Sequence, residues 1–145
     1  MTVADTTHSS IVIAAEPAPI MEVIADVERY PEWIVGLESV VVNESDASGR
    51  PMSATFHGNL GMVRDSYTVA YAWGDEDVEW HLTHGEKLTG MDGHYICRDR
   101  GDGSTEVEYR LAVELAIPVV GMLRRRGEKV IVDSALKGLK RRVEG

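Results

Sequence analysis

The chain has 145 residues and a formal net charge of −9, with 43% hydrophobic and 27% charged residues. These values are typical of one globular domain spanning residues 1–145, and they exclude disordered and collagen-like chains. The charge is uneven: residues 118–145 carry eight Lys or Arg and three acids, net +5, so the rest carries −14. An acidic body with a basic end argues against nucleic-acid binding over the whole surface.

The single cysteine, Cys97, excludes an intrachain disulfide and is consistent with a reducing compartment. Residues 1–10 lack the basic and apolar regions of a signal peptide. No apolar run approaches the roughly 20 residues that span a bilayer. We therefore expect a soluble, cytoplasmic protein.

The first part of the chain predicts a strand followed by two short helices. Ser9–Ala15 is apolar and β-branched, which favours a strand. Pro17 suits a first helical turn, and Pro31 disfavours helix at the residue before it. Residues 31–36 predict a separate helical turn. The helix between the prolines has the i, i+3, i+4, i+7 spacing of Ile20, Val23, Ile24 and Val27.

The next part of the chain, up to Pro118, lacks helical periodicity. Turn signals separate short segments rich in Val, Thr, Tyr and Trp. This pattern indicates antiparallel hairpins, because parallel crossovers need a dozen or more residues. Apolar and charged residues alternate most clearly over 63–73, 78–82 and 107–115. One dry face and one wet face indicate a sheet covered on a single side.

Residues 119–143 predict one long helix after Pro118. A helix of about 25 residues is roughly 37 Å long, enough to cross a sheet. Because strands and helices segregate along the chain, the predicted class is α+β, with this helix covering the sheet. Its broad apolar stripe comprises Leu123, Val130, Ile131, Ala135, Leu136, Leu139 and Val143.

The most distinctive motif is Asp26-Val27-Glu28-Arg29-Tyr30-Pro31-Glu32-Trp33, supported by residues 11–14 and 131–144. Together with the order of elements, it resembles the SRPBCC/START-like superfamily, in particular its bacterial polyketide cyclase/dehydrase and coenzyme-Q-binding-like branch. The resemblance covers essentially the whole chain. It implies a helix-grip fold: a seven-stranded antiparallel sheet wrapped around a long C-terminal helix, with two short helices after the first strand and an apolar cavity.

The resemblance also implies binding of a hydrophobic molecule such as a lipid, isoprenoid or polyketide. It does not imply one reaction, because the fold hosts carriers, cyclases and hydrolases alike. Our first hypothesis is a carrier without enzymatic activity. The second is a polyketide cyclase or aromatase that acts by substrate positioning and proton transfer, and the third is a partner-binding module whose cavity is filled by side chains.

Groups with obvious chemistry are few. The histidines lack the spacing of a compact metal pair, and the sequence has no nucleophile elbow, phosphate loop or dinucleotide fingerprint. We therefore expect neither a metal nor a cofactor. Cys97 is expected to be a buried, inert thiol.

Asp65 is the one weak catalytic candidate. It shares the dry face of its predicted strand with Val63 and Tyr67, where a carboxylate is costly unless it is hydrogen-bonded. It is either a general base with a raised pKa, as a cyclase needs, or a strand-end carboxylate that stays in solvent. We favour the second interpretation.

Aromatic side chains gather on the predicted concave face. A tyrosine supplies a flat apolar wall and a hydroxyl that can orient a ligand oxygen, although such residues can also be core aromatics with satisfied hydroxyls. Gly93 and its small neighbours either leave cavity volume or let the sheet bend. The expected ligand contacts are Phe56, Val63, Tyr67, Val69, Tyr71, Trp80, Tyr95, Tyr109, Leu111, Ile131 and Ala135.

Arg124, Arg125 and Arg126 lie near the start of the long helix. Three consecutive residues span about 200° around a helix, so they cannot all face inward. They either form a solvated face paired with the acidic sheet or dock an anionic partner. That partner would be a membrane surface or an acyl-carrier protein.

Overall fold

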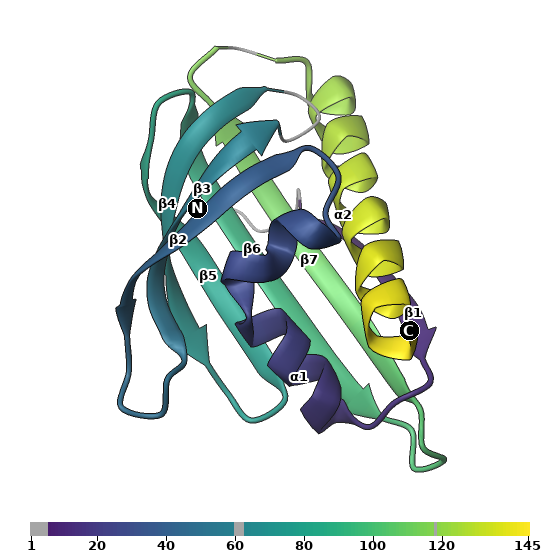
Figure 1. The fold of residues 1–145 in the computed structure, drawn as a ribbon. Coiled ribbons are helices and arrows are strands. Elements are labelled where there is room, and N and C mark those ends of the chain that lie inside the picture. Colours follow the sequence, from purple (N-terminus) through teal and green to yellow (C-terminus); the bar gives the residue numbers. More distant parts are fainter. Residues whose placement is uncertain (1–5, 60–62, 118) are drawn as a thin grey trace.

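The computed structural model describes residues 6–59, 63–117 and 119–145. A seven-stranded antiparallel sheet of order β1-β7-β6-β5-β4-β3-β2 curves around the long helix α2 (Figure 1). This confirms the α+β helix-grip fold. The elements are β1 (Thr7–Ile13), α1 (Pro17–Ala25), the 3₁₀ helix η1 (Val27–Glu32), β2 (Leu37–Ser45), β3 (Pro51–Asn59), β4 (Arg64–Trp73), β5 (Asp77–Gly85), β6 (Leu88–Asp99), β7 (Thr105–Leu115) and α2 (Gly121–Glu144).

The strands from β2 to β7 pair as successive hairpins, and β1 joins β7 at the other edge of the sheet. The predicted first helix is divided at Asp26, whose N–H bonds to the carbonyls of Glu22 and Val23 before η1 begins. Helices α1 and η1 cross the concave face at one end of the sheet (Figure 1). They bury Ile20 and Ile24 completely, so this end of the fold is closed by packed side chains.

Helix α2 packs mainly against β1, β7 and α1, along one side of the sheet (Figure 1). Its buried positions begin at Glu128 and continue to Leu139. The expectation that Leu123 and Val130 belong to the buried stripe is wrong, because they are 54% and 57% exposed. None of residues 121–127 is buried, so the helix begins beyond the region where it packs. Within the described residues, no helix has the length and apolar character needed to span a membrane.

Gly138 sets how closely α2 approaches the start of the chain. A Cβ atom at this position would lie 2.4 Å from the carbonyl oxygen of Trp33. Such a distance is a clash, so any larger residue would push α2 away from the segment that follows η1. The helix is therefore fixed against both the sheet and η1.

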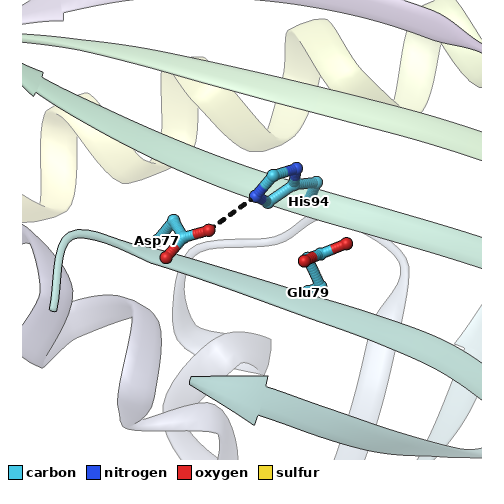
Figure 2. A group of neighbouring side chains, drawn as sticks. All are labelled: Asp77, Glu79 and His94. Carbon is cyan, nitrogen blue, oxygen red and sulfur yellow. Dashed lines mark hydrogen bonds and ion pairs between the residues drawn. The ribbon is translucent and has the colours of Figure 1, made fainter. Parts of the chain in front are cut away.

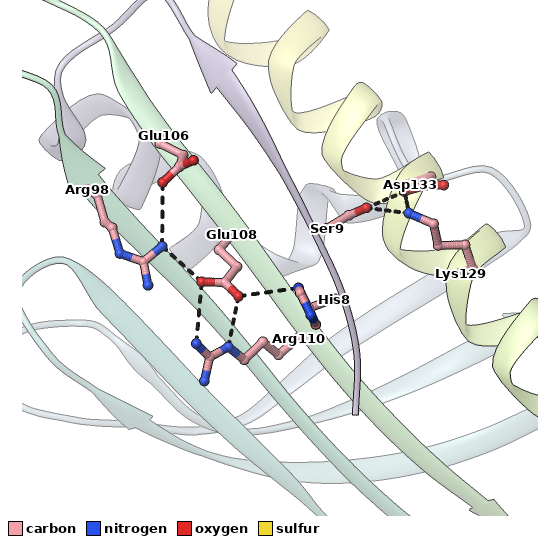
Figure 3. Close-up of polar contacts among 8 residues, drawn as sticks. All are labelled: His8, Ser9, Arg98, Glu106, Glu108, Arg110, Lys129 and Asp133. Atoms are coloured by element: carbon pink, nitrogen blue, oxygen red, sulfur yellow. Dashed lines mark hydrogen bonds and ion pairs between the residues drawn. The ribbon is translucent and has the colours of Figure 1, made fainter. Parts of the chain in front are cut away.

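Strand β1 is held to α2 by polar contacts as well as by packing (Figure 3). The hydroxyl of Ser9 donates to Asp133 at 2.8 Å, and the ammonium of Lys129 donates to the Ser9 oxygen at 2.6 Å. On the outer face of the sheet, Glu108 accepts hydrogen bonds from Arg110 and pairs with Arg98. These contacts with Arg110 and Arg98 lower the pKa of Glu108.

The described ion pairs of α2 lie both within the helix and between the helix and η1. Lys129 and Lys140 pair with acids one turn further along α2, and Arg142 pairs with Glu32 of η1 at 2.8 Å. The acidic outer face of the sheet, by contrast, pairs Glu108 with arginines of its own strands. Among these ion pairs, the one between Arg142 and Glu32 joins the basic end of the chain to its acidic body.

Glu128 is a fully buried carboxylate at the junction of α2 with the sheet. It accepts a hydrogen bond from the Thr7 hydroxyl at 2.6 Å and another from the Val113 N–H at 2.8 Å. Among the described residues, the pairing of β1 with β7 runs from Thr7 opposite Leu111 to Ile13 opposite Thr105. Val113 lies two residues beyond Leu111, and Glu128 satisfies its buried N–H donor.

Asp65 performs a similar task at the hairpin between β5 and β6. Its carboxylate accepts hydrogen bonds from the N–H groups of Leu88, Lys87, Ser66 and Glu86, at 2.9, 3.1, 2.8 and 3.3 Å. Burial by itself raises the pKa of Asp65, but these four N–H groups together hold the pKa below its usual value. The side chain therefore ties the hairpin to β4 as an ionised acceptor.

We expect the substitution Glu128→Ala to lower the free energy of unfolding by about 1–3 kcal/mol, because it leaves the Val113 N–H buried without an acceptor. Urea unfolding followed by circular dichroism measures the change. The control is Glu114→Ala, at an exposed position of β7. Equal stability of the two variants would contradict the role given to Glu128.

Asp65→Asn is expected to lower the free energy of unfolding by about 1–3 kcal/mol at pH 7. The pKa of Asp65 is lower in the folded than in the unfolded state, so ionised Asp65 stabilises the fold above the unfolded pKa of about 3.9. That contribution is lost as the pH falls through the folded pKa. The difference from wild type should therefore shrink below about pH 4. Unfolding curves at neutral and acid pH, with the exposed Asp92→Asn as control, test this; a pH-independent difference would refute it.

Candidate functional site

A cavity of about 420 Å³ lies between the concave face of the sheet and α2. Strands β3 to β7 supply most of its wall, and η1, the loop after η1 and α2 complete it. All of the sequence-predicted contact residues except Val63 line it: Phe56, Tyr67, Val69, Tyr71, Trp80, Tyr95, Tyr109, Leu111, Ile131 and Ala135. Contact of these residues with a ligand stays a prediction.

Val63 does not line the cavity, because β4 begins only at Arg64 and the inward alternation starts at Asp65. The structure adds residues that the sequence pattern does not single out. Tyr30 lines the cavity, and its hydroxyl donates to the Ile24 carbonyl oxygen. The other additions with large apolar side chains are Ile34, Val35, Leu37, Met91 and Val130.

The aromatic residues form a continuous wall. Ring centroids of Tyr95 and Tyr109 are 4.5 Å apart, and the Trp80 ring lies 5.5 and 5.7 Å from them. Tyr71 extends this wall on the other side of Trp80, at 6.2 Å. A Cβ atom at Gly93 would lie 2.0 Å from the Trp80 ring, so the glycine is what lets the indole lie against β6. Such offset and tilted pairs are the favoured arrangement of aromatic rings.

Four of these tyrosines have no partner for their hydroxyl. Tyr67, Tyr71, Tyr95 and Tyr109 line the cavity, and their hydroxyls make no hydrogen bond with the described residues; nor do protein atoms enclose their oxygens. Burial raises the pKa of all four phenols, and for three of them a neighbouring tyrosine raises it further. The hydroxyls therefore stay protonated and can donate hydrogen bonds into the cavity.

The described wall of the cavity contains no carboxylate, imidazole, amine, guanidinium or thiol. Asp65 lies outside it, is 3% exposed and has a lowered pKa. The interpretation of Asp65 as a solvent-facing carboxylate is thus wrong, and its lowered pKa is opposite to the raised pKa expected of a general base; a catalytic role stays a prediction. Cys97 is buried against Met21, with the two sulfurs 3.8 Å apart, and burial raises the pKa of its thiol to about 12.

A second group of polar side chains lies on the outer face of the sheet, away from the cavity (Figure 2). Asp77 and Glu79 of β5 and His94 of β6 bring their ligand-type atoms within 4.8 Å of one another. The spacing between histidines along the sequence does not reveal this cross-strand group, because His94 meets the two carboxylates from the neighbouring strand. The Nε2 atom of His94 lies 2.8 Å from an Asp77 oxygen, and the second carboxylate, that of Glu79, is nearby.

Several solved structures share this fold. A START superfamily protein from Mycobacterium smegmatis matches with a TM-score of 0.89 and 21% identity, over 96% of this chain and 97% of that one. A protein from Thermus thermophilus matches with a TM-score of 0.81 and 22% identity, over 96% and 97% of the two chains. The Zhui aromatase/cyclase from Streptomyces sp. R1128 has a TM-score of 0.79 and 13% identity, over 96% and 93%.

Comparison with curated proteins finds no match. The sequence profile of the family described as polyketide cyclase / dehydrase and lipid transport matches residues 13–140. This range runs from the end of β1 to the last turns of α2 and includes every element of the cavity wall. The chain therefore belongs to the polyketide cyclase/dehydrase and lipid transport family.

Proposed function

We propose that the protein binds a hydrophobic small molecule with at least one oxygen-bearing group and carries it without chemical change. The observation that supports this proposal is an apolar cavity whose aromatic wall presents four tyrosine hydroxyls without partners among the described residues. A cavity of about 420 Å³ is within the range of ligand pockets, which are mostly apolar with a few polar groups that orient the ligand.

The apolar wall supplies the affinity in this proposal. Each buried methylene contributes roughly 0.8 kcal/mol, so ten of them give about 8 kcal/mol before the costs of association. The hydroxyls supply orientation and selectivity, because a ligand oxygen must accept from phenols that otherwise stay unpaired. A lipid, isoprenoid or polyketide with an oxygen at one end meets both requirements.

The distribution of titratable groups favours a carrier over a cyclase. Ring closure by proton transfer needs an acid and a base within reach of the same substrate. The raised pKa values keep the tyrosines protonated, so they can donate hydrogen bonds but provide almost no phenolate to act as a base. The nearest carboxylate among the sequence candidates, Asp65, holds the β5–β6 hairpin and lies outside the wall.

A polyketide cyclase or aromatase is the second candidate function, and the neighbouring rings of Tyr95 and Tyr109 support it. Their rings are 4.5 Å apart, so two donors could hold neighbouring carbonyl oxygens of a ketide chain in a folded conformation. In that case catalysis would come from positioning, with water as the base. The fold neighbour named as an aromatase/cyclase agrees with this possibility at the level of fold only.

Organic extraction of the purified protein, followed by mass spectrometry, tests the two functions. A carrier is expected to release one class of intact hydrophobic molecule at a constant ratio. Incubation with a linear poly-β-ketone, followed by product analysis, gives cyclised product only for the second function. If the protein cyclises the poly-β-ketone faster than buffer alone does, and if Tyr95→Phe abolishes this activity, the carrier proposal is wrong and the cyclase function replaces it.

Delivery of the ligand is part of the proposal. The cations Arg124, Arg125 and Arg126 at the start of α2 are proposed to contact an anionic partner, either a membrane surface or an acyl-carrier protein. Location in the cytoplasm likewise stays a prediction. The reduced Cys97 is compatible with it.

Filling the cavity should abolish binding. Ala135 lies on α2 in the cavity wall, so Ala135→Phe places a ring in the space that a ligand would occupy. We expect at least tenfold weaker binding of parinaric acid, a fluorescent fatty acid, because several buried methylenes are displaced. Ala47→Phe, in the exposed β2–β3 turn, is the control. Unchanged affinity in a folded Ala135→Phe protein would place the binding site elsewhere.

Removing two hydroxyls should weaken the binding of ligands that carry oxygen but not the binding of hydrocarbons. The double variant Tyr95→Phe/Tyr109→Phe keeps the aromatic wall and deletes two donors. At about 0.5–1.5 kcal/mol for each of the two hydrogen bonds, parinaric acid should bind roughly 5- to 150-fold more weakly. The hydrocarbon diphenylhexatriene, which accepts no hydrogen bond, should bind with unchanged affinity. A parallel loss for both probes would mean that the hydroxyls act through packing.

A further inference from the structure

We propose that the protein docks on an anionic lipid membrane through the start of α2, with the mouth of its cavity against the bilayer. This inference rests on the proposed ligand-binding function, because it supplies the surface from which the ligand is exchanged. The proposed contact is an apolar rim, which we define as Ile117, Val119, Val120, Met122, Leu123 and Val130.

The apolar rim gathers most of the large apolar side chains that are exposed in the described residues. Ten such side chains are exposed, and six of them belong to the rim; the other four lie on β1, β2, β3 and the η1–β2 loop. Ile117, Val120 and Met122 are 69%, 68% and 65% exposed. Single exposed apolar residues need no explanation, but a group of this kind marks an interaction surface.

The charge of the same stretch is of one sign. Between residues 117 and 130 the cations are Arg124, Arg125, Arg126 and Lys129. The one acid, Glu128, is fully buried and bonded to Val113, so it does not neutralise the surface. The exposed side chains of this stretch are thus apolar or cationic, which complements anionic headgroups above an apolar layer.

The three arginines are not placed to complement the dipole of the helix. The positive end of the macrodipole lies at the start of α2, where acidic side chains stabilise and cations do not. The first turn of α2 has no acidic residue, and the preceding Val120 provides no side-chain cap. Three arginines near this end therefore add positive charge where the helix dipole does not favour it.

The apolar rim is continuous with the cavity. Val130 belongs to the rim, is 57% exposed and also lines the cavity. Val35 of the loop after η1 is 83% exposed and lines the cavity as well. These two residues mark the mouth, and the start of α2 lies at the opposite end of the fold from α1 (Figure 1).

The continuity of rim and mouth favours a membrane over an acidic carrier protein. Apolar side chains of the rim can enter the acyl boundary while the guanidinium groups stay among the phosphates. A hydrophobic ligand could then pass between bilayer and cavity without exposing its apolar surface to water. An acidic protein would complement the charge of the arginines but would not provide an acyl layer for the apolar residues of the rim.

Vesicle sedimentation tests the proposal, with phosphatidylcholine vesicles that contain or lack phosphatidylglycerol, at low and high salt. The rim variants are Arg125→Gln/Arg126→Gln and Met122→Gln/Leu123→Gln. Lys137→Gln/Arg141→Gln, further along the same helix, is the matched charge control, and Val41→Gln/Met52→Gln is the matched apolar control.

We expect salt-sensitive binding to the anionic vesicles, weakened about tenfold or more by each rim variant and unchanged by each control. Absence of binding at low salt, or equal losses in rim and control variants, would overturn the proposal. Binding of a purified acyl-carrier protein, with no vesicle binding, would overturn it in favour of a protein partner.

The same variants are titrated with parinaric acid in the absence of vesicles. The rim variants should retain its affinity, because their side chains lie outside the cavity wall. If parinaric acid binds and vesicles do not, the docking proposal fails while the ligand-binding function stands. If vesicles bind and parinaric acid does not, the ligand-binding function fails instead.

Discussion

The attachment of α2 to one side of a curved sheet is the constraint from which the rest of the structure follows. The helix packs on β1, β7 and α1, and Glu128 connects it to the sheet by accepting hydrogen bonds from Thr7 of β1 and Val113 of β7. A straight helix on one side of a curved seven-stranded sheet cannot reach the concave face of the other strands. The space that remains is lined by aromatic side chains from those strands, and it is the cavity.

The same constraint explains why the wall is rich in tyrosine. A packed core favours Leu, Ile and Val, whose side chains have no polar atom to satisfy. Here Tyr71, Tyr95 and Tyr109 face open space, so their hydroxyls need a partner that the described protein does not provide. Gly93 shows that the wall is built for aromatic rings, since no other residue leaves room for the Trp80 indole. Hydroxyl groups without a hydrogen-bond partner inside an apolar cavity destabilise the fold, unless a ligand accepts their hydrogen bonds.

Alternation of apolar and charged residues was sufficient to predict the sheet and most of its inward face, because the period of two is set by the backbone. It was not sufficient where a residue's role depends on a distant partner. Asp65 occupies an inward position as predicted, yet its chemistry is decided by N–H groups of a hairpin about 20 residues away. The loop residue Val35 has no periodicity to reveal it, and the Asp77–His94 pair arises only from the register of β5 and β6.

The exposure of Leu123 and Val130, which were expected in the buried stripe of α2, shows most clearly what periodicity cannot predict. The spacing of Leu123 and Val130 correctly predicts a helix, but periodicity cannot say how far along the helix the sheet extends. In the structure the packing begins at Glu128, and the preceding turns have no buried residue. A helix buried along its whole length would seal the cavity at this end. The first turns of α2 have no side-chain cap and no buried residue, which weakens the helix locally. Their exposure is therefore what leaves the cavity open beside Val130.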